Sequence, residues 1–119
     1  MNSEALLTYY VEKLTPRLQR AGEAIRDMQK SLVSTPYPPA STGGNPPHRR
    51  SGNLQREIAC DEVQLQGTSL VIHNFVPEAL VPYAIFLEHG TNRMSPRPFF
   101  EAGRQMALPR VRQILAGGL

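Results

Sequence analysis

Residues 3–33 read SEALLTYYVEKLTPRLQRAGEAIRDMQKSLV and carry the strongest periodic pattern in the chain. Apolar residues recur there at alternating intervals of four and three positions, the spacing of one helical face: Leu7, Val11, Leu14, Leu18, Ala21, Ile25, Met28 and Leu32. The pattern predicts a long amphipathic helix, capped by Asn2 or Ser3 and kinked at Pro16. It favours packing on the protein's own sheet; a coiled-coil seam between subunits is the alternative.

Residues 58–76 carry the clearest strand pattern. Residues 69–75, SLVIHNF, are rich in β-branched and apolar side chains, and Gly67-Thr68 marks a turn before them. The two features predict a β-hairpin. Apolar alternation in the first strand slips once near Asp61-Glu62, and we expect a β-bulge to absorb the slip.

The last third of the chain predicts two more helices. Pro82 is well placed as the first residue of a short helix over residues 83–88, and Gly90 is its expected stop. A longer helix is expected over residues 99–115, with Pro98 in its first turn.

Residues 34–53, STPYPPASTGGNPPHRRSGN, separate the long helix from the hairpin. They show no apolar periodicity and are rich in Pro, Gly, Ser and Asn. Prolines stiffen a chain toward polyproline II, so we expect a projecting arm that becomes ordered only against neighbouring molecules. The arm is followed by a predicted single helical turn within residues 51–58.

The expected fold class is therefore α+β, in one domain over residues 1–119. A small antiparallel sheet, the hairpin of about residues 58–76, packs against a long kinked N-terminal helix and a C-terminal helix, with a long Pro-rich arm at 34–53. We expect both helices to cover one face of the sheet.

Composition restricts the function classes. The chain has 119 residues and a formal charge of +3, from 13 Lys+Arg against 10 Asp+Glu. Eleven of the 13 basic residues are arginine, which suits ion pairs at protein interfaces. No apolar run approaches the roughly 20 residues of a membrane span. Cys60, the only cysteine, has no companion for a disulfide or zinc site, so a reducing cytoplasm is expected.

Chemistry-bearing residues form no recognisable catalytic pattern. His48, His73 and His89 lack the spacing of metal ligands. The Gly43-Gly44 pair lacks the lysine and preceding strand of a phosphate-binding loop. We therefore expect neither an enzyme nor a metal ion or other cofactor.

Several cations lie in predicted loops, next to Pro and Gly: His48, Arg49, Arg50, Arg93 and Arg97. Two interpretations stay open on composition alone. These side chains contact phosphate or an acidic partner surface, or they are solvated surface charge.

Two segments together resemble the head-tail joining, or neck, protein family of long-tailed bacteriophages, which includes tail-completion and minor tail proteins. The first runs from Pro-Tyr-Pro-Pro (36–39) through GNPPHRRSGNLQREI (44–58) and is similar to a proline-rich stretch followed by Thr/Ser-Gly-x-Leu-x-x-x-Ile. The second is YAIFLEHGT (83–91) followed by RPFF (97–100), similar to Tyr-Ala-x-x-x-Glu-x-Gly-Thr and Arg-Pro-Phe. The resemblance covers roughly residues 36–101.

The resemblance implies residues that build the fold and residues that face partners. Its fold motif falls on Leu54, Ile58, Tyr83, Glu88, Gly90, Thr91, Pro98 and Phe99. Glu88 is expected to accept hydrogen bonds from nearby backbone amides or to pair with Arg97, and so to pin its turn against the sheet. Gly90 is expected to supply a positive φ. The expected protein interface is Tyr37, His48, Arg49, Arg50, Arg93 and Arg97.

The resemblance also implies a structural role in the virion. The expected partners are further copies of the chain in a ring and the neighbouring phage connector, tail-terminator or tail-tube proteins. DNA passing through the ring is expected to be contacted only non-specifically, and no membrane contact is expected. Assembly would take place in the host cytoplasm and end at the head-tail interface. The alternative function is a small arginine-rich nucleic-acid-binding module.

Overall fold

The computed structural model describes residues 2–34, 43–44, 52–92 and 95–117. Within these ranges two helices are followed by four short antiparallel strands and then by two further helices, which confirms the α+β class. In chain order the elements are α1 (Ser3–Leu32), α2 (Asn53–Glu57), β1 (Ala59–Cys60), β2 (Gln64–Gln66), β3 (Ser69–Val71), β4 (Asn74–Phe75), α3 (Ala84–His89) and α4 (Phe100–Ala116).

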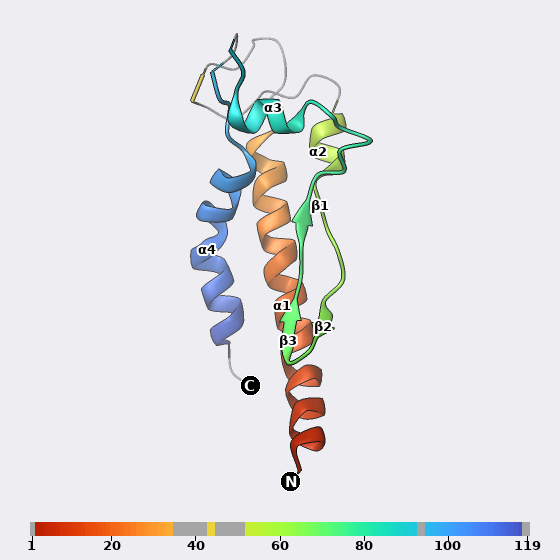
Figure 1. Cartoon of the computed structure of the whole chain (residues 1–119). Helices are drawn as coiled ribbons and strands as arrows, with labels where there is room; N and C mark the ends of the chain where they lie inside the picture. The colour runs from red at the N-terminus through yellow and green to blue at the C-terminus, as the bar shows by residue number, and fades with distance from the viewer. Residues whose placement is uncertain (1, 35–42, 45–51, 93–94, 118–119) are drawn as a thin grey trace.

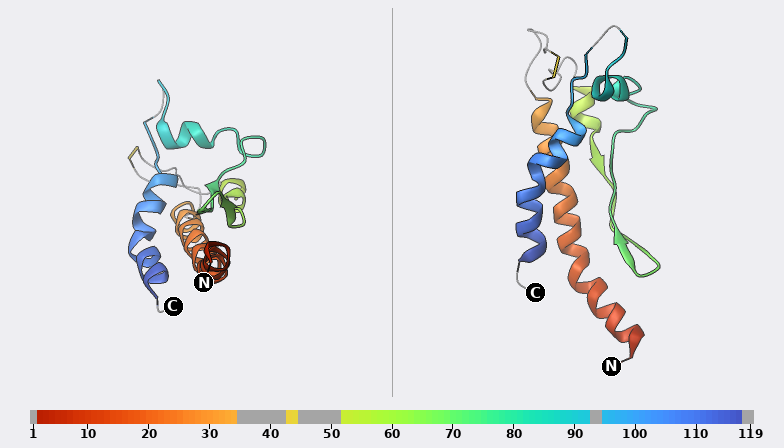
Figure 2. Two further views of the ribbon diagram at one scale, coloured as in Figure 1. Left: turned by 60° about the horizontal axis from the view of Figure 1, so that its bottom comes forward. Right: turned by 60° about the vertical axis from the view of Figure 1, so that its left-hand side comes forward.

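Helix α1 is the spine of the molecule (Figure 1). Helix α4 runs antiparallel along one side of α1, and the β-hairpin runs along another side (Figures 1 and 2). The short helix α3 lies transverse to α1, at the same end of the molecule as the C-terminal end of α1 (Figures 1 and 2). The layer order therefore differs from our expectation that both long helices cover one face of the sheet, because α1 lies between α4 and the strands.

The long predicted helix is confirmed. Asn2 caps it, with its side-chain Oδ1 accepting from the backbone N–H of Ala5 at 2.8 Å. Pro16 lies inside the helix, and Figure 2 shows the axis of α1 turning within the half that contains this proline. No residue from 2 to 16 is buried, so the N-terminal half of the apolar stripe is only partly covered.

The hairpin contains the predicted bulge. Gln64 pairs with Val71 and Cys60 with Asn74, so the first strand carries one more residue between the two ladders than the second. A bulge leaves backbone groups without ladder partners, and Gln19 of α1 satisfies two of them. Its Oε1 accepts from the N–H of Val63 at 3.1 Å, and its Nε2 donates to the carbonyl of Asp61 at 3.3 Å. The irregularity thus ties the hairpin to α1.

The hydrophobic core is small and lies where α2, α3, the C-terminal end of α1 and the start of α4 converge. Its buried members are Val33, Leu54, Ile58, Val81, Ala84 and Phe99. Three residues of the fold motif, Leu54, Ile58 and Phe99, therefore serve the core. Far from this end, the elements are held by helix packing and by side chains that bond to backbone.

Helices α1 and α4 approach each other closely at Gly103. A Cβ atom at this position would lie 2.5 Å from Cγ and 2.8 Å from Cα of Gln29. Gln29 is fully buried and donates from Nε2 to the carbonyl of Phe100 at 2.8 Å. The absence of a side chain at Gly103 therefore sets the distance between the two helices.

The proline positions differ slightly from expectation. Pro98 precedes the helix instead of lying in its first turn, because α4 begins at Phe100 with Phe99 in the N-cap position. Pro82 likewise lies before α3, whose N-cap position is Tyr83. Helix α4 continues through Pro109 to Ala116 without a break.

We expect Gly103→Ala to lower the free energy of unfolding by about 1–3 kcal/mol, because the new methyl group overlaps the backbone of α1. Helix propensity alone predicts the opposite sign, a gain of roughly 1 kcal/mol. Urea unfolding measures the difference. Gly117→Ala is the control, since a Cβ there meets nothing closer than 3.4 Å. A more stable Gly103→Ala variant would contradict this account of the helix contact.

We expect the carboxylate of Asp61 to stabilise the hairpin in a pH-dependent way. The backbone N–H of His73 donates to Oδ1 at 2.7 Å, and this bond lowers the pKa of Asp61 below its ordinary value of 3.8. Because the pKa of Asp61 is lower in the folded state than in the unfolded state, the stabilisation is fully present above the unfolded-state pKa. It is lost as the pH falls from there through the folded-state pKa. Thermal unfolding from about pH 5 to pH 2 should show a smaller decline for Asp61→Asn than for the wild type. Glu62→Gln, an exposed neighbour, should follow the wild type.

Candidate functional site

Helix α3 is a short element with sharply defined ends. It follows a proline-flanked turn, and Gly90 stops it with a φ of 77°. The N–H of Gly90 donates to the carbonyl of Phe86 at 2.7 Å. The expected positive φ at Gly90 is thus confirmed, and only glycine adopts it without strain.

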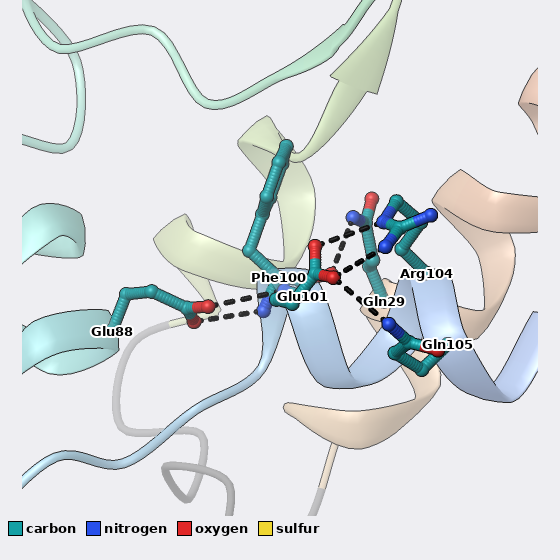
Figure 3. A network of polar contacts seen from close by, with 6 residues as sticks. All are labelled: Gln29, Glu88, Phe100, Glu101, Arg104 and Gln105. Carbon is teal, nitrogen blue, oxygen red and sulfur yellow. Dashed lines mark hydrogen bonds and ion pairs between the residues drawn. The ribbon is translucent and has the colours of Figure 1, made fainter.

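The Glu88 carboxylate of α3 caps the N-terminus of α4 (Figure 3). Oε1 accepts from the N–H groups of Phe99 and Phe100, both at 2.9 Å, and Oε2 accepts from the N–H of Glu101 at 3.0 Å. Phe99, in the N-cap position, provides no side-chain cap of its own. A carboxylate there satisfies amides that lack helical partners and lies at the positive end of the helix dipole.

This contact settles the expectation for Glu88. Of the two predicted arrangements, bonding to backbone amides is confirmed, and within the described residues no ion pair joins Glu88 to Arg97. The expected role changes in one respect, because Glu88 fastens α3 to α4 and does not pin its turn against the sheet. Arg97 contributes through its backbone, whose N–H donates to the carbonyl of Leu87 at 2.7 Å.

The first turn of α4 is held from two further directions (Figure 3). Gln29 of α1 bonds to the carbonyl of Phe100. On the outer side, Arg104 and Gln105 donate to Glu101, with Arg104 Nε lying 2.8 Å from Oε2 and Gln105 Nε2 lying 3.1 Å from Oε1. The bonds from Arg104 and then Gln105 lower the pKa of Glu101 to about 2. Three helices are thus joined at one point.

The expected interface residues are only partly covered by the structure. Tyr37, His48, Arg49, Arg50 and Arg93 lie outside the described residues. Arg97 is half-buried, and its Nε is enclosed with no hydrogen-bond partner among the described residues.

One described part of the predicted arm contacts the body of the protein. The N–H of Gly44 donates to the carbonyl of Pro96 at 2.8 Å. A Cβ at Gly43 would lie 2.7 Å from the Cβ of Ser95. Gly43-Gly44 and the loop before α4 therefore lie side by side, close to Arg97.

Two clusters of exposed apolar side chains were not anticipated as surface. The α3 patch consists of Leu80, Tyr83, Ile85 and Phe86, and the α1 tip consists of Leu6, Tyr9 and Tyr10. Tyr83 belonged to the expected fold motif, yet its side chain is exposed. Thr91 is also exposed. The sequence feature that could have indicated the α3 patch is the predicted short helix of residues 83–88, which is apolar on more than one side.

Two further features were sought among the described residues, a metal-binding cluster and a membrane-spanning helix. In the ranges 2–34, 43–44, 52–92 and 95–117, no three His, Cys, Asp or Glu residues gather closely enough to hold a metal ion. None of the helices described is long and apolar enough to cross a bilayer. The chemistry that the described surface does offer is apolar protein contact.

We expect Glu88→Ala to lower the free energy of unfolding by about 1–3 kcal/mol, because three amides lose a charged acceptor. Glu88→Gln keeps one acceptor oxygen and should lose less. Chemical denaturation gives both values, and amide hydrogen exchange at residues 99–101 shows whether the loss is local. Glu78→Gln, at an exposed site outside the cap, is the control. Equal stability of the Glu88→Ala and Glu78→Gln variants would show that the cap contributes nothing.

No protein-family model, curated protein or solved structure matches this chain.

Proposed function

We propose that the protein is a structural virion assembly protein of the phage neck or tail. In this proposal it joins or completes the tail at the head-tail interface as a subunit of a homo-oligomeric ring. The observation that carries the proposal is the large apolar surface that stays exposed on an elongated molecule whose helices are joined by the Glu88 cap. Support from the sequence is the resemblance of residues 36–101 to the neck proteins.

The shape of the subunit supports a protein that functions in an assembly. Its Cα radius of gyration is 17.2 Å, against about 13.5 Å for a compact domain of this length. Large apolar side chains are exposed on both long helices, the hairpin and α3. A chain this small buries only about two-thirds of its unfolded surface by itself, so neighbouring subunits would provide the remaining burial.

The Glu88 cap supports the same role from another direction. The motif residues Glu88, Gly90 and Phe99 all serve to fasten α3 and α4 together. A motif with this use maintains the shape of a subunit and carries no reactive group. Rigid, shape-defining motifs suit a protein whose function is to fit between neighbours in a ring.

The proposed neighbours are other copies of the chain and the connector, tail-terminator or tail-tube proteins, all within the virion. The nucleic-acid-binding alternative was based on four loop arginines. Of its four arginines, Arg49, Arg50 and Arg93 lie outside the described ranges, and Arg97 has an enclosed Nε. Filter binding that weakens steeply with salt would favour this alternative.

We expect deletion of residues 36–48 to leave a folded protein that no longer joins tails to heads. The segment includes few apolar side chains for the core, and shortening a surface connection lowers its closure entropy. Loss of contacts that repeat around a symmetry axis is multiplied in a ring. Complementation of a deletion phage, read by electron microscopy, should show filled heads and separate tails. Leu65→Ser, an exposed change on the hairpin, is the control, and normal particles with the deleted protein would reject the proposed role of this segment.

A further inference from the structure

We propose that neighbouring copies of this chain join head to tail, with the α1 tip of one copy (Leu6, Tyr9 and Tyr10) seated on the α3 patch of the next. This inference deepens the proposed function and rests on it only in taking the partner to be a second copy. The other exposed apolar residues, on the hairpin and α4, are scattered. Only in the α1 tip and the α3 patch do three or more exposed large apolar residues, among those described, lie within seven residues of one another in the sequence.

The α1 tip lies on a part of the helix that protrudes beyond the rest of the described molecule. Helix α4 ends beside Arg17, whose Nη1 lies 3.5 Å from the carbonyl of Leu115. No residue N-terminal to Arg17 is buried, and Figures 1 and 2 show the N-terminal turns of α1 extending past α4 and the hairpin. The projecting turns therefore have no covering element among the described parts of their own subunit.

The apolar surface of α1 is widest where it protrudes. At 100° per residue, Tyr9, Leu6, Tyr10, Leu14 and Val11 are spread over roughly 200° of the helix circumference, an arc that also contains Lys13 and Ser3. Farther along α1, the large apolar side chains Leu18, Ile25 and Met28 cover about 80°. Apolar side chains at the tip therefore extend beyond the stripe that one covering face needs, and Lys13 lies over the Tyr9 ring within it. The extra width at the tip therefore indicates a second contact surface.

The geometry of the tip suits insertion into a partner. Leu6, Tyr9 and Tyr10 have the i, i+3, i+4 spacing of helices that dock into apolar grooves. The tyrosine rings pack edge to face with centroids 5.7 Å apart, and Lys13 Nζ lies 5.7 Å from the centre of the Tyr9 ring. Pre-arranged tyrosines lose little conformational entropy on binding.

The α3 patch has the size and position that the tip needs. Leu80, Ile85 and Phe86 are 60%, 59% and 54% exposed. The seven residues of the two clusters together expose roughly 700 Å². Specific, stable interfaces bury about 1,200 Å² or more in total, so the clusters form the apolar centre of the contact and the residues around them supply the remaining area.

The two clusters cannot meet within one subunit. From Tyr10 to the C-terminal end of α1, the end at which α3 lies, the helix rises roughly 35 Å, and the molecule is 59 Å long. Contact between them is therefore intermolecular. Joined head to tail, the two patches make a heterologous contact, the type that generates rings when the rotation closes, whereas two antiparallel copies that make the contact twice would form a closed dimer.

The test uses one variant for each cluster and measures sedimentation. The tip variant is Leu6→Ser/Tyr10→Ser, the α3 variant is Ile85→Ser/Phe86→Ser, and the control is Leu65→Ser/Met106→Ser, at two exposed apolar sites outside both clusters. All the substitutions are at exposed positions, so circular dichroism and the unfolding midpoint should match the wild type.

Head-to-tail contact predicts a specific pattern. The wild type and the control should associate further as concentration rises, and each cluster variant alone should sediment as a monomer. An equimolar mixture of the two cluster variants should form a dimer and nothing larger, because the mixture retains one intact tip and one intact patch per pair. A monomeric mixture, a monomeric wild type or an α3 variant that associates normally would overturn the inference.

The sedimentation result and the test of the neck role can fail independently. Dimers in the mixture, together with normal tail joining by phage that lack the protein, would retain this contact and reject the neck role. Tail joining that requires the protein, together with a monomeric mixture, would retain the role and reject this contact.

Discussion

The Glu88 carboxylate joins α3 to the first turn of α4 at the end of the molecule that contains the hydrophobic core. Helix α4 begins beside buried Phe99 without a capping side chain of its own, so its first amides need an acceptor from elsewhere in the chain. Glu88 supplies two oxygens to three N–H groups. Its position on α3 depends in turn on the Gly90 stop. The cap therefore couples the placement of α3, the core and the direction of α4 along α1.

The small size of the hydrophobic core determines how the other elements are held. The largest buried side chains gather at the capped end, where Gln29 also bonds to the first turn of α4. Farther along, the buried residues are small, such as Ala21 of α1 and Ala107 of α4, and polar side chains bond to backbone. Gln19 satisfies the hairpin bulge, and Asn74 donates to the carbonyl of Gly22 at 3.0 Å. Such bonds align elements accurately but cover little apolar area. The result is a well-defined, extended molecule with exposed apolar surface.

This combination explains why the proposed function is structural. A ring subunit needs a fixed shape before assembly and incomplete burial until assembly. The capped end and the polar anchors provide the first property, and the α1 tip and the α3 patch provide the second. Among the described residues, no three His, Cys, Asp or Glu side chains gather closely enough to hold a metal ion.

The sequence by itself determined the elements whose signals are local. Helical periodicity placed α1, turn residues and β-branched side chains placed the hairpin, the slip at Asp61-Glu62 placed the bulge, and Gly90 marked the end of α3. Only the tertiary structure decided which of two partners Glu88 would take, that α1 lies between α4 and the strands, and that Tyr83 is exposed. These outcomes depend on residues distant in the chain, such as Gln29 against Gly103. Local propensity shows what a segment can form, whereas burial and hydrogen-bond partners are set by the segments packed against it.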